Sequence, residues 1–335
     1  MPPQTRKKRR QRGGKSIFNF LSNNSASATK KYRPPHLEER SSCHPSVKPM
    51  KIDNTESCLT ETNIAKLGAD WNKAHSKKLI PLDDATKTWK SMREVLKDRC
   101  TTEYCWINQP FVSSAVRSEL KKQFRPAAPA SWETDSTEWL DSDNIYKMLM
   151  QLTEAYPYFT TIYPSPIDFD KKIYDSIYNG ECVVNELCQL NVQRDLREKG
   201  KTAFGIVFNL DKHDEGGSHW VALYIDLAGN STRLAGAYYW DSYGYQAPNR
   251  IKTLMKRIKN QEKLNGNNSF VLEENTVRHQ RKNSECGIYS LYFIASMLEG
   301  RTFEDITKNI VDDDTINQMR HVYFTWGGAI AVRRD

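Results

Sequence analysis

The sequence of 335 residues predicts an α+β fold over residues 131–335, preceded by a helical domain over residues 53–130 and a basic tail over residues 1–52. Two observations lead to this prediction. After residue 131, short apolar segments typical of strands are interspersed with helical patterns, as in α+β or mixed α/β proteins. Before it, the apolar residues recur at helical spacing, and the Pro- and Ala-rich segment 125–130 connects the two regions.

The tail differs from the rest of the chain in charge. Residues 1–51 contain 13 Lys or Arg against Glu38 and Glu39, so they carry a net charge of +11 and the remaining residues carry −3. Few of these residues can build a core, so we expect a disordered tail. Its charge favours binding to nucleic acid, to a nuclear import receptor or to an acidic surface, and a tail that only solubilises the protein is the alternative.

Three amphipathic segments predict the helical domain. Thr60 can cap the first helix, Asp83 can cap the second, and Ser114 can open the third. The residues expected on the inner faces are Ile64, Leu67 and Trp71, then Trp89, Met92 and Leu96, and finally Val116 and Leu120.

The α+β region begins with a helix that Ser142 can cap, with Ile145, Leu149 and Leu152 on its inner face. Strands are expected at 159–163, 204–210, 219–226, 237–241 and 269–272, and further helices at 249–260 and 286–298.

Seven cysteines without any Cys-x-x-Cys motif argue against a disulfide framework and fit a reducing compartment. The odd number also leaves one thiol for a special role. Cys100 and Cys105 lack partners at zinc spacing, so we expect them to contribute to packing. No apolar run reaches the roughly 18 residues of a membrane span, and we expect neither a transmembrane segment nor a signal peptide.

Three residues in separate segments can form a nucleophilic site. His219 lies at the start of a strand, Asp241 at the end of an aromatic strand, and Cys286 at the start of an apolar helix. Each has an ordinary explanation by itself, because small buried cysteines and histidines at strand ends are common. Together they supply a base, its orienting acid and a nucleophile whose thiolate is favoured by the helix N-terminus.

Three neighbouring residues can complete this site. Gln280, six residues before Cys286, has an amide donor that can join the Cys286 backbone N–H around a developing oxyanion. Gly287 lets a substrate backbone approach closely. Trp220 either packs in the core or clamps a narrow groove that admits only glycine, since glycine has no side chain.

These motifs resemble a clan of cysteine proteases that unites adenain with the proteases of ubiquitin-like modifiers. Its members carry His-Trp, then Asp or Asn, then Gln followed six residues later by Cys-Gly. Within the clan, the chain is most similar to the SUMO-protease-like enzymes of large cytoplasmic DNA viruses, the African swine fever virus type, over residues 56–325. The segments that carry this similarity are 105–110, 217–222, 278–280, 285–287 and 289–291.

The resemblance implies a mixed central sheet flanked by helices, with an N-terminal helical arm domain. It implies cleavage of viral polyprotein precursors after Gly-Gly during virion maturation, without a metal or organic cofactor. It places the protein in the host cytoplasm at virus assembly sites and in the virion, and not among secreted proteins. The implied catalytic residues are His219, Asp241, Cys286 and Gln280, and the implied substrate contacts are Trp220 and Gly287.

Other functions stay open. A deSUMOylase or deubiquitinase also releases products that end in Gly-Gly, an acyltransferase can use the same triad, and a virion structural protein could bind nucleic acid through residues 1–51. A further hypothesis is self-cleavage at Gly14–Lys15 or at Gly328–Ala329. The simpler alternative is that these glycines only make turns or tails flexible.

Overall fold

The computed structural model describes residues 42–327 apart from 175–176 and 178–179. Most of the basic tail and both candidate self-cleavage sites, Gly14–Lys15 and Gly328–Ala329, lie outside the described residues, so the hypotheses about them stay predictions. Within the described ranges, no helix combines the length and the apolar character that crossing a membrane requires.

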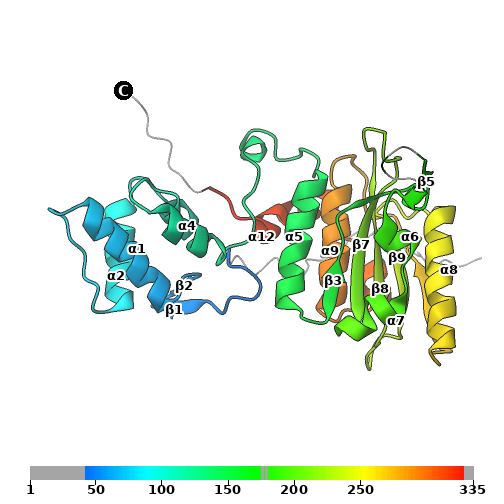
Figure 1. The fold of residues 1–335 in the computed structure, drawn as a ribbon. Coiled ribbons are helices and arrows are strands. Elements are labelled where there is room, and N and C mark those ends of the chain that lie inside the picture. The colour runs from blue at the N-terminus through cyan, green and yellow to red at the C-terminus, as the bar shows by residue number, and fades with distance from the viewer. Residues whose placement is uncertain (1–41, 175–176, 178–179, 328–335) are drawn as a thin grey trace, which may run out of the picture. The chain divides into compact units, whose positions relative to one another are not determined.

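A six-stranded mixed sheet organises the second half of the chain (Figure 1). The strand order is β10-β9-β8-β7-β3, and β4 also pairs with β7. The pairs β7–β8 and β8–β9 are antiparallel, whereas β3, β4 and β10 run parallel to their neighbours. The bounds are β3 Phe159–Thr161, β4 Ser165–Pro166, β7 Ala203–Asn209, β8 Trp220–Asp226, β9 Gly236–Trp240 and β10 Val271–Glu274. The predicted mixed sheet is confirmed.

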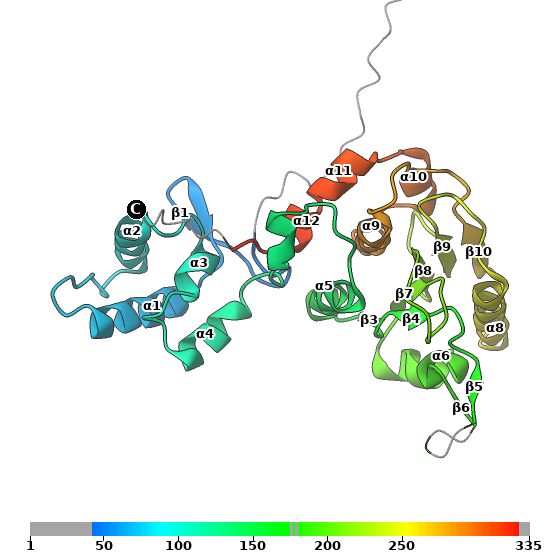
Figure 2. The same ribbon diagram turned by 90° about the horizontal axis from the view of Figure 1, so that it is seen from above.

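Helices cover both faces of this sheet (Figures 1 and 2). On one face lie α5 (Ser142–Ala155) and α9 (Cys286–Leu298), and on the other lie α6 (Asn185–Cys188), α7 (Val192–Asp195) and α8 (Asn249–Leu264). Successive side chains of a strand point to opposite faces. Tyr238 and Trp240 of β9 therefore join the hydrophobic cluster around α9, and Tyr239 joins the cluster around α8.

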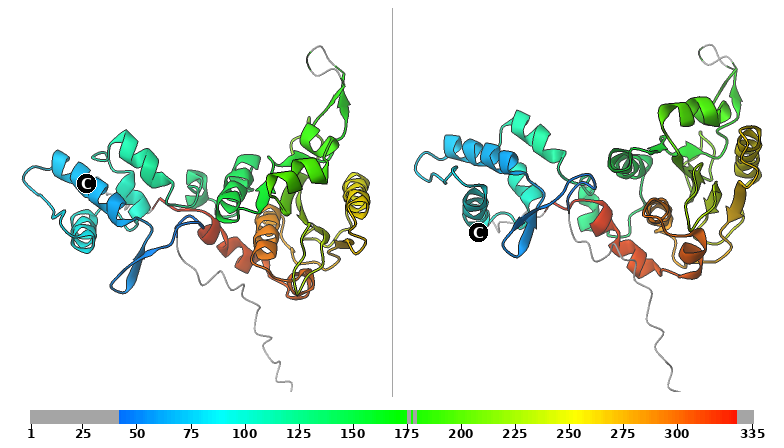
Figure 3. Two further views of the ribbon diagram at one scale, coloured as in Figure 1. Left: turned by 60° about the horizontal axis from the view of Figure 1, so that its bottom comes forward. Right: turned by 90° about the horizontal axis from the view of Figure 1, so that it is seen from below.

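Short elements complete this region. The helices α10 (Phe303–Lys308), α11 (Asp313–Gln318) and α12 (Arg320–Tyr323), near the red end of the colour scale in Figure 3, contribute to the same cluster as α9. A small hairpin consists of β5 (Lys172–Ile173) and β6 (Glu181–Cys182).

The helix α9 is buried along its whole length. All 13 of its residues are buried, because its sequence is apolar on every side. Its bounds agree with the predicted helix at 286–298. A helix of this kind has little freedom to shift, so its first residue, Cys286, has a fixed place at the end of the core.

The N-terminal region builds a separate hydrophobic cluster from residues between Cys43 and Phe124. Thr60 caps α1 through a hydrogen bond from the Asn63 amide, as predicted, whereas Asp84 and not Asp83 caps α2. The division into domains at residues 53 and 131 stays a prediction. The elements of this region are β1 (Met50–Ile52), β2 (Thr55–Ser57), α1 (Glu61–Ala74), α2 (Ala85–Leu96), α3 (Glu103–Ile107) and α4 (Ser114–Lys121).

The predicted extent of the disordered tail, residues 1–52, is wrong at its C-terminal end. Cys43 and His44 are buried, and Met50–Ile52 pairs with Thr55–Ser57 as an antiparallel hairpin. Composition missed this order because residues 42–52 have too few apolar side chains to suggest a core by themselves.

The expectation of a chain without disulfides is also wrong. The structure joins Cys43 to Cys58, Cys100 to Cys105, and Cys182 to Cys188. Pairing depends on the distance between cysteines in the fold and not on a local spacing motif. The odd cysteine is Cys286, which is the free thiol.

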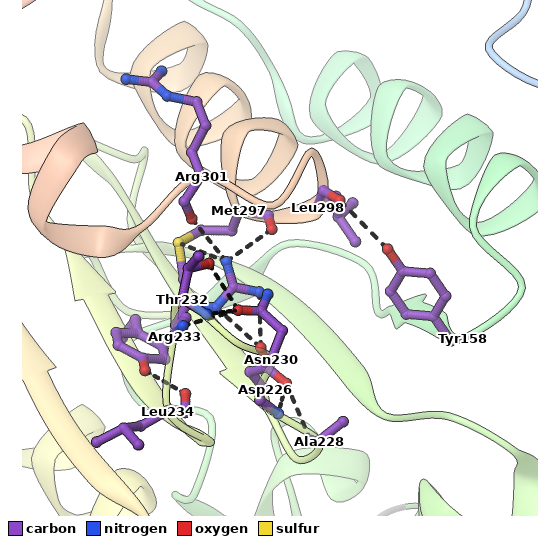
Figure 4. A network of polar contacts seen from close by, with 12 residues as sticks. Tyr158, Asp226, Ala228, Asn230, Thr232, Arg233, Leu234, Met297, Leu298 and Arg301 are labelled. Atoms are coloured by element: carbon purple, nitrogen blue, oxygen red, sulfur yellow. Dashed lines mark hydrogen bonds and ion pairs between the residues drawn. The ribbon is translucent and has the colours of Figure 1, made fainter.

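A buried ion pair attaches the C-terminal end of α9 to the sheet (Figure 4). Arg233 and Asp226 are 2.7 Å apart and both are almost fully buried. The Arg233 guanidinium also donates to the carbonyl oxygens of Met297 at 3.0 Å and Arg301 at 2.8 Å. It therefore joins the strand β8, which carries Asp226, to carbonyl oxygens at and just beyond the C-terminal end of α9.

We expect Arg233→Met to destabilise the fold by about 3–5 kcal/mol, because it leaves the Asp226 carboxylate buried without its partner. Urea unfolding followed by circular dichroism measures this change. Lys308→Met, which removes an exposed ion pair with Glu304, is the matched control and should change stability little. Equal effects of the two substitutions would contradict the role of the Arg233 pair.

Candidate functional site

The first component of the site is a paired imidazole. His219 stands directly before β8, and Asp241 directly after β9, so the antiparallel pairing of these strands brings them together. The His219 Nε2 donates to the Asp241 Oδ1 at 2.9 Å, and the carboxylate is buried. Burial by itself lowers the pKa of His219, but hydrogen bonds and charges of Asp241 and Cys286 outweigh it and raise the pKa to about 9.

The second component is the thiol of Cys286 at the N-terminus of α9. It is the free cysteine, it is buried, and its proximity to His219 contributes to the raised pKa of the imidazole. Because Nε2 of His219 is occupied by Asp241, the ring nitrogen left for the thiol is Nδ1. The amide groups of the first helical turn lack partners within the helix, which favours negative charge at this end.

The third component is the side chain of Gln280, which is fully buried. Its Oε1 accepts a hydrogen bond from the Ser242 hydroxyl at 2.6 Å. Within the part of the chain that the structure describes, its Nε2 has no hydrogen-bond partner. A buried donor without a partner is costly, and such groups concentrate where function requires them.

Two residues that the sequence interpretation missed support Asp241 and His219. Asn275 is buried, and its Nδ2 donates to the backbone oxygens of Asp241 at 2.8 Å and Val277 at 3.0 Å. Tyr243 donates its backbone N–H to Asp241 Oδ1 at 2.8 Å, and its ring stacks on the His219 ring at 5.0 Å between centroids. An aromatic residue just after Asp241 was the available signal for Tyr243.

Trp220 and Gly287 lie against each other, together with Leu140. The Trp220 Nε1 donates to the Leu140 backbone oxygen at 2.9 Å. A Cβ added to Gly287 would lie 3.0 Å from the Leu140 Cβ and 3.4 Å from the Trp220 Cδ1. Packing therefore leaves little room for a side chain at 287, and close approach of a substrate to Gly287 stays a prediction.

A groove of about 710 Å³ has Trp220, the residue after His219, in its wall. The described residues that line it do not include the four predicted catalytic residues. Gly216 and Gly217, from the loop before His219, line it as well. So does Trp139, whose side chain is 44% exposed and which the sequence interpretation missed. Its position directly before the predicted helix cap was the signal, since an exposed tryptophan beside a groove is typical of a binding surface.

The arrangement suits nucleophilic attack on a carbonyl carbon. It brings together three predicted catalytic residues, the thiol of Cys286, the base His219 and the orienting Asp241. The fourth, Gln280, is joined by a hydrogen bond to Ser242, the residue after Asp241, and supplies an amide donor. The catalytic roles of these four residues stay predictions.

Comparisons with known proteins give a consistent result. Residues 146–323 match the family described as the Ulp1 protease family, C-terminal catalytic domain. A thiol protease of Acanthamoeba polyphaga mimivirus is 31% identical over 227 residues, which are 66% of this chain and 68% of that protein. The SUMO-1 cysteine protease of African swine fever virus is 27% identical over 235 residues, 67% of this chain and 83% of that protein.

The fold is similar to that of a solved viral protease. A crystal structure of the African swine fever virus protease matches with a TM-score of 0.62 at 21% identity, and the match covers 89% of this chain and 98% of that one. The two proteins share a fold.

We expect the His219 imidazole to stay protonated through neutral pH and to titrate near pH 9. Asp241→Asn removes the carboxylate charge that raises this pKa, so the midpoint should move to lower pH. NMR of the isotope-labelled imidazole nitrogens measures both midpoints. His321 is the internal control, because burial and the Arg320 charge lower its pKa and Asp241 does not contribute. A His219 midpoint that is the same in both proteins would contradict the pairing.

Proposed function

Because the chain belongs to the Ulp1 protease family and is a cysteine protease, we propose that it cleaves viral polyprotein precursors after Gly-Gly during virion maturation. The observation that carries the proposal is a free thiol at the start of α9 next to an imidazole that is paired with a buried carboxylate. The buried Gln280 amide, hydrogen-bonded to the residue after that carboxylate, supports it. The viral origin of the relatives supports the choice of substrate class.

The proposed reaction uses each of these groups in turn. The Cys286 thiolate attacks the carbonyl carbon of the second glycine while the His219 imidazolium holds the proton. The oxygen becomes negative in the tetrahedral intermediate, where the Gln280 Nε2 and the Cys286 backbone N–H stabilise it. His219 then gives the proton to the leaving amine, and water, activated by the same imidazole, releases the acid product. Asp241 orients His219 throughout.

The groove gives a physical reason for glycine near the scissile bond. Two tryptophans, Trp139 and Trp220, line it, and Trp220 is held in place by its hydrogen bond to Leu140. A side chain on the substrate would have to pass these rings, whereas a glycine brings only its backbone. We therefore propose Trp220 as a substrate-binding residue, with Gly287 allowing it to pack against α9.

A second candidate within the same chemistry is removal of a folded modifier. The relative named SUMO-1 cysteine protease supports this alternative. A modifier also ends in Gly-Gly, but its recognition needs a wide surface outside the groove. The two candidates therefore differ in whether a short peptide is enough as a substrate.

The tail supports a separate proposal, binding of nucleic acid through residues 1–51. Its net charge of +11 contrasts with −3 for the remaining residues. Such a tail can hold a protease on a packaged genome, in keeping with a proposed location at cytoplasmic assembly sites and in the virion.

For the cleavage reaction we expect wild-type protein to cut Gly-Gly-Xaa peptides after the second glycine. Cys286→Ala and His219→Ala should each reduce kcat by about 10⁴-fold or more, and Asp241→Ala by about 10²–10⁴-fold. Mass spectrometry of the products locates the cut, and circular dichroism checks the fold. Replacement of the second glycine by alanine should abolish cleavage. Cleavage of a modifier fusion but of no peptide would favour the second candidate, and turnover retained in Cys286→Ala would exclude this nucleophile.

For the tail, we expect deletion of residues 1–41, which keeps the disulfide of Cys43 and the hairpin strand Met50–Ile52 in place, to weaken binding to double-stranded DNA and to reduce its dependence on salt. Peptide cleavage without DNA should be unchanged. Fluorescence anisotropy over a range of salt concentrations measures the first effect. A deletion variant that binds DNA as tightly as the full chain would show that the tail is not the binding segment.

A further inference from the structure

Ser242 connects the acid of the site to the residue that donates to the oxyanion. It follows Asp241 directly, where β9 ends, and it is buried. Its backbone oxygen accepts hydrogen bonds from the amides of both His279 at 2.8 Å and Gln280 at 2.9 Å. The backbone of residues 279–280 is therefore fixed onto the turn that carries Asp241.

The side chain of Ser242 adds a contact of a different kind. Its hydroxyl lies 2.6 Å from the Gln280 Oε1, and both residues are at most 1% exposed. This distance fits an O–H donor on an oxygen acceptor better than an amide N–H donor. The contact therefore assigns the oxygen of the Gln280 amide to Ser242 and turns the nitrogen to the opposite side.

The orientation of this amide matters because its two ends have opposite chemistry. The nitrogen end donates two hydrogen bonds, and the oxygen end only accepts them. If the amide rotated by half a turn, Oε1 would take the place of the unpartnered Nε2. An acceptor in that place would repel a developing oxyanion and would not stabilise it.

We propose that Ser242 is a positioning residue that holds the Gln280 amide with Nε2 toward the oxyanion. The inference rests on the proposed role of Gln280 as oxyanion donor. Ser242 does not touch the reacting atoms; it acts through Gln280. The turn after β9 thus serves both halves of the reaction, because Asp241 orients the base and Ser242 orients the oxyanion donor.

The contacts of the neighbouring loop support a fixed Gln280 backbone and leave the amide orientation to Ser242. Asn275 holds the carbonyl oxygens of Asp241 and Val277, and the Arg278 Nε donates to the Gln280 backbone oxygen at 2.8 Å. These bonds place the residue but do not choose between the two ends of its amide. Among the contacts of the described residues, the one that favours one end of the amide is that of the Ser242 hydroxyl.

The test is a double-mutant cycle of Ser242→Ala and Gln280→Ala, measured as kcat and KM on a peptide that the wild type cleaves. Ser242→Ala should lower kcat by about 10–100-fold and change KM by less than about 3-fold, because the loss falls on the transition state. In the Gln280→Ala background the same substitution should cost less than about 3-fold. Ser242→Thr keeps the hydroxyl and should recover most of kcat.

Two further measurements separate positioning from a general loss of structure. A peptide aldehyde with the substrate sequence forms a tetrahedral adduct with the thiol, so its inhibition constant should rise in Ser242→Ala by a factor similar to the fall in kcat. Ser296→Ala removes a buried serine near the C-terminal end of α9, away from Cys286, which accepts from Arg301 at 3.4 Å, and should leave kcat unchanged. Urea unfolding compares the stability of all variants.

The outcomes distinguish this inference from the proposed function. Equal costs of Ser242→Ala in both backgrounds, or a Ser242→Thr variant as slow as Ser242→Ala, would overturn the positioning role. A Gln280→Ala variant with wild-type kcat would instead overturn the role of Gln280. A wild type that cuts elsewhere than after Gly-Gly would overturn only the proposed specificity, since the cycle can be run on whichever peptide is cleaved.

Discussion

The burial of α9 on every side is the constraint on which the site depends. A helix that is apolar all round must lie inside the core, and here it packs on the sheet beside α5, with α10–α12 completing its cover. The helix therefore begins at the edge of the core, where the backbone N–H groups of its first turn have no hydrogen-bond acceptor within the helix. The position of Cys286 is therefore a consequence of core packing, and its chemistry is a consequence of the helix end.

The sheet places the other groups around this thiol. The antiparallel strands β8 and β9 put His219 and Asp241 at the same edge, although 22 residues separate them in the chain. The turn after β9 and the loop before α9 are then joined through Ser242 and Asn275. Asp241 and Gln280 thus share one set of hydrogen bonds, to which His219 is joined through the Asp241 carboxylate, so a shift of this turn would displace all three residues.

The cysteines divide by their surroundings. Six are paired in disulfides, two of these pairs within the N-terminal cluster and one beside α6, and the seventh lies next to a protonated imidazole. A disulfide removes a thiol from nucleophilic chemistry, so the pairing leaves Cys286 as the reactive one among the described residues. The odd number of cysteines correctly predicted one free thiol, whereas the absence of a Cys-x-x-Cys motif wrongly suggested a chain without disulfides.

Local patterns in the sequence determined the longer elements of the fold and the motif of the site. Apolar periodicity predicted the bounds of α9, and it placed the strands of the central sheet other than β4 to within two residues of their observed ends. Capping preferences predicted the cap at Thr60. Both signals involve residues that are neighbours in the chain. The residues His219, Asp241, Gln280 and Cys286 were identifiable from their chemistry and spacing. The tertiary structure alone decided which cysteines pair, that residues 42–52 are ordered, that Gly287 packs on Trp220, and that Ser242 holds Gln280. Each of these depends on groups distant in sequence that meet within a few ångströms, and no local pattern specifies such a meeting.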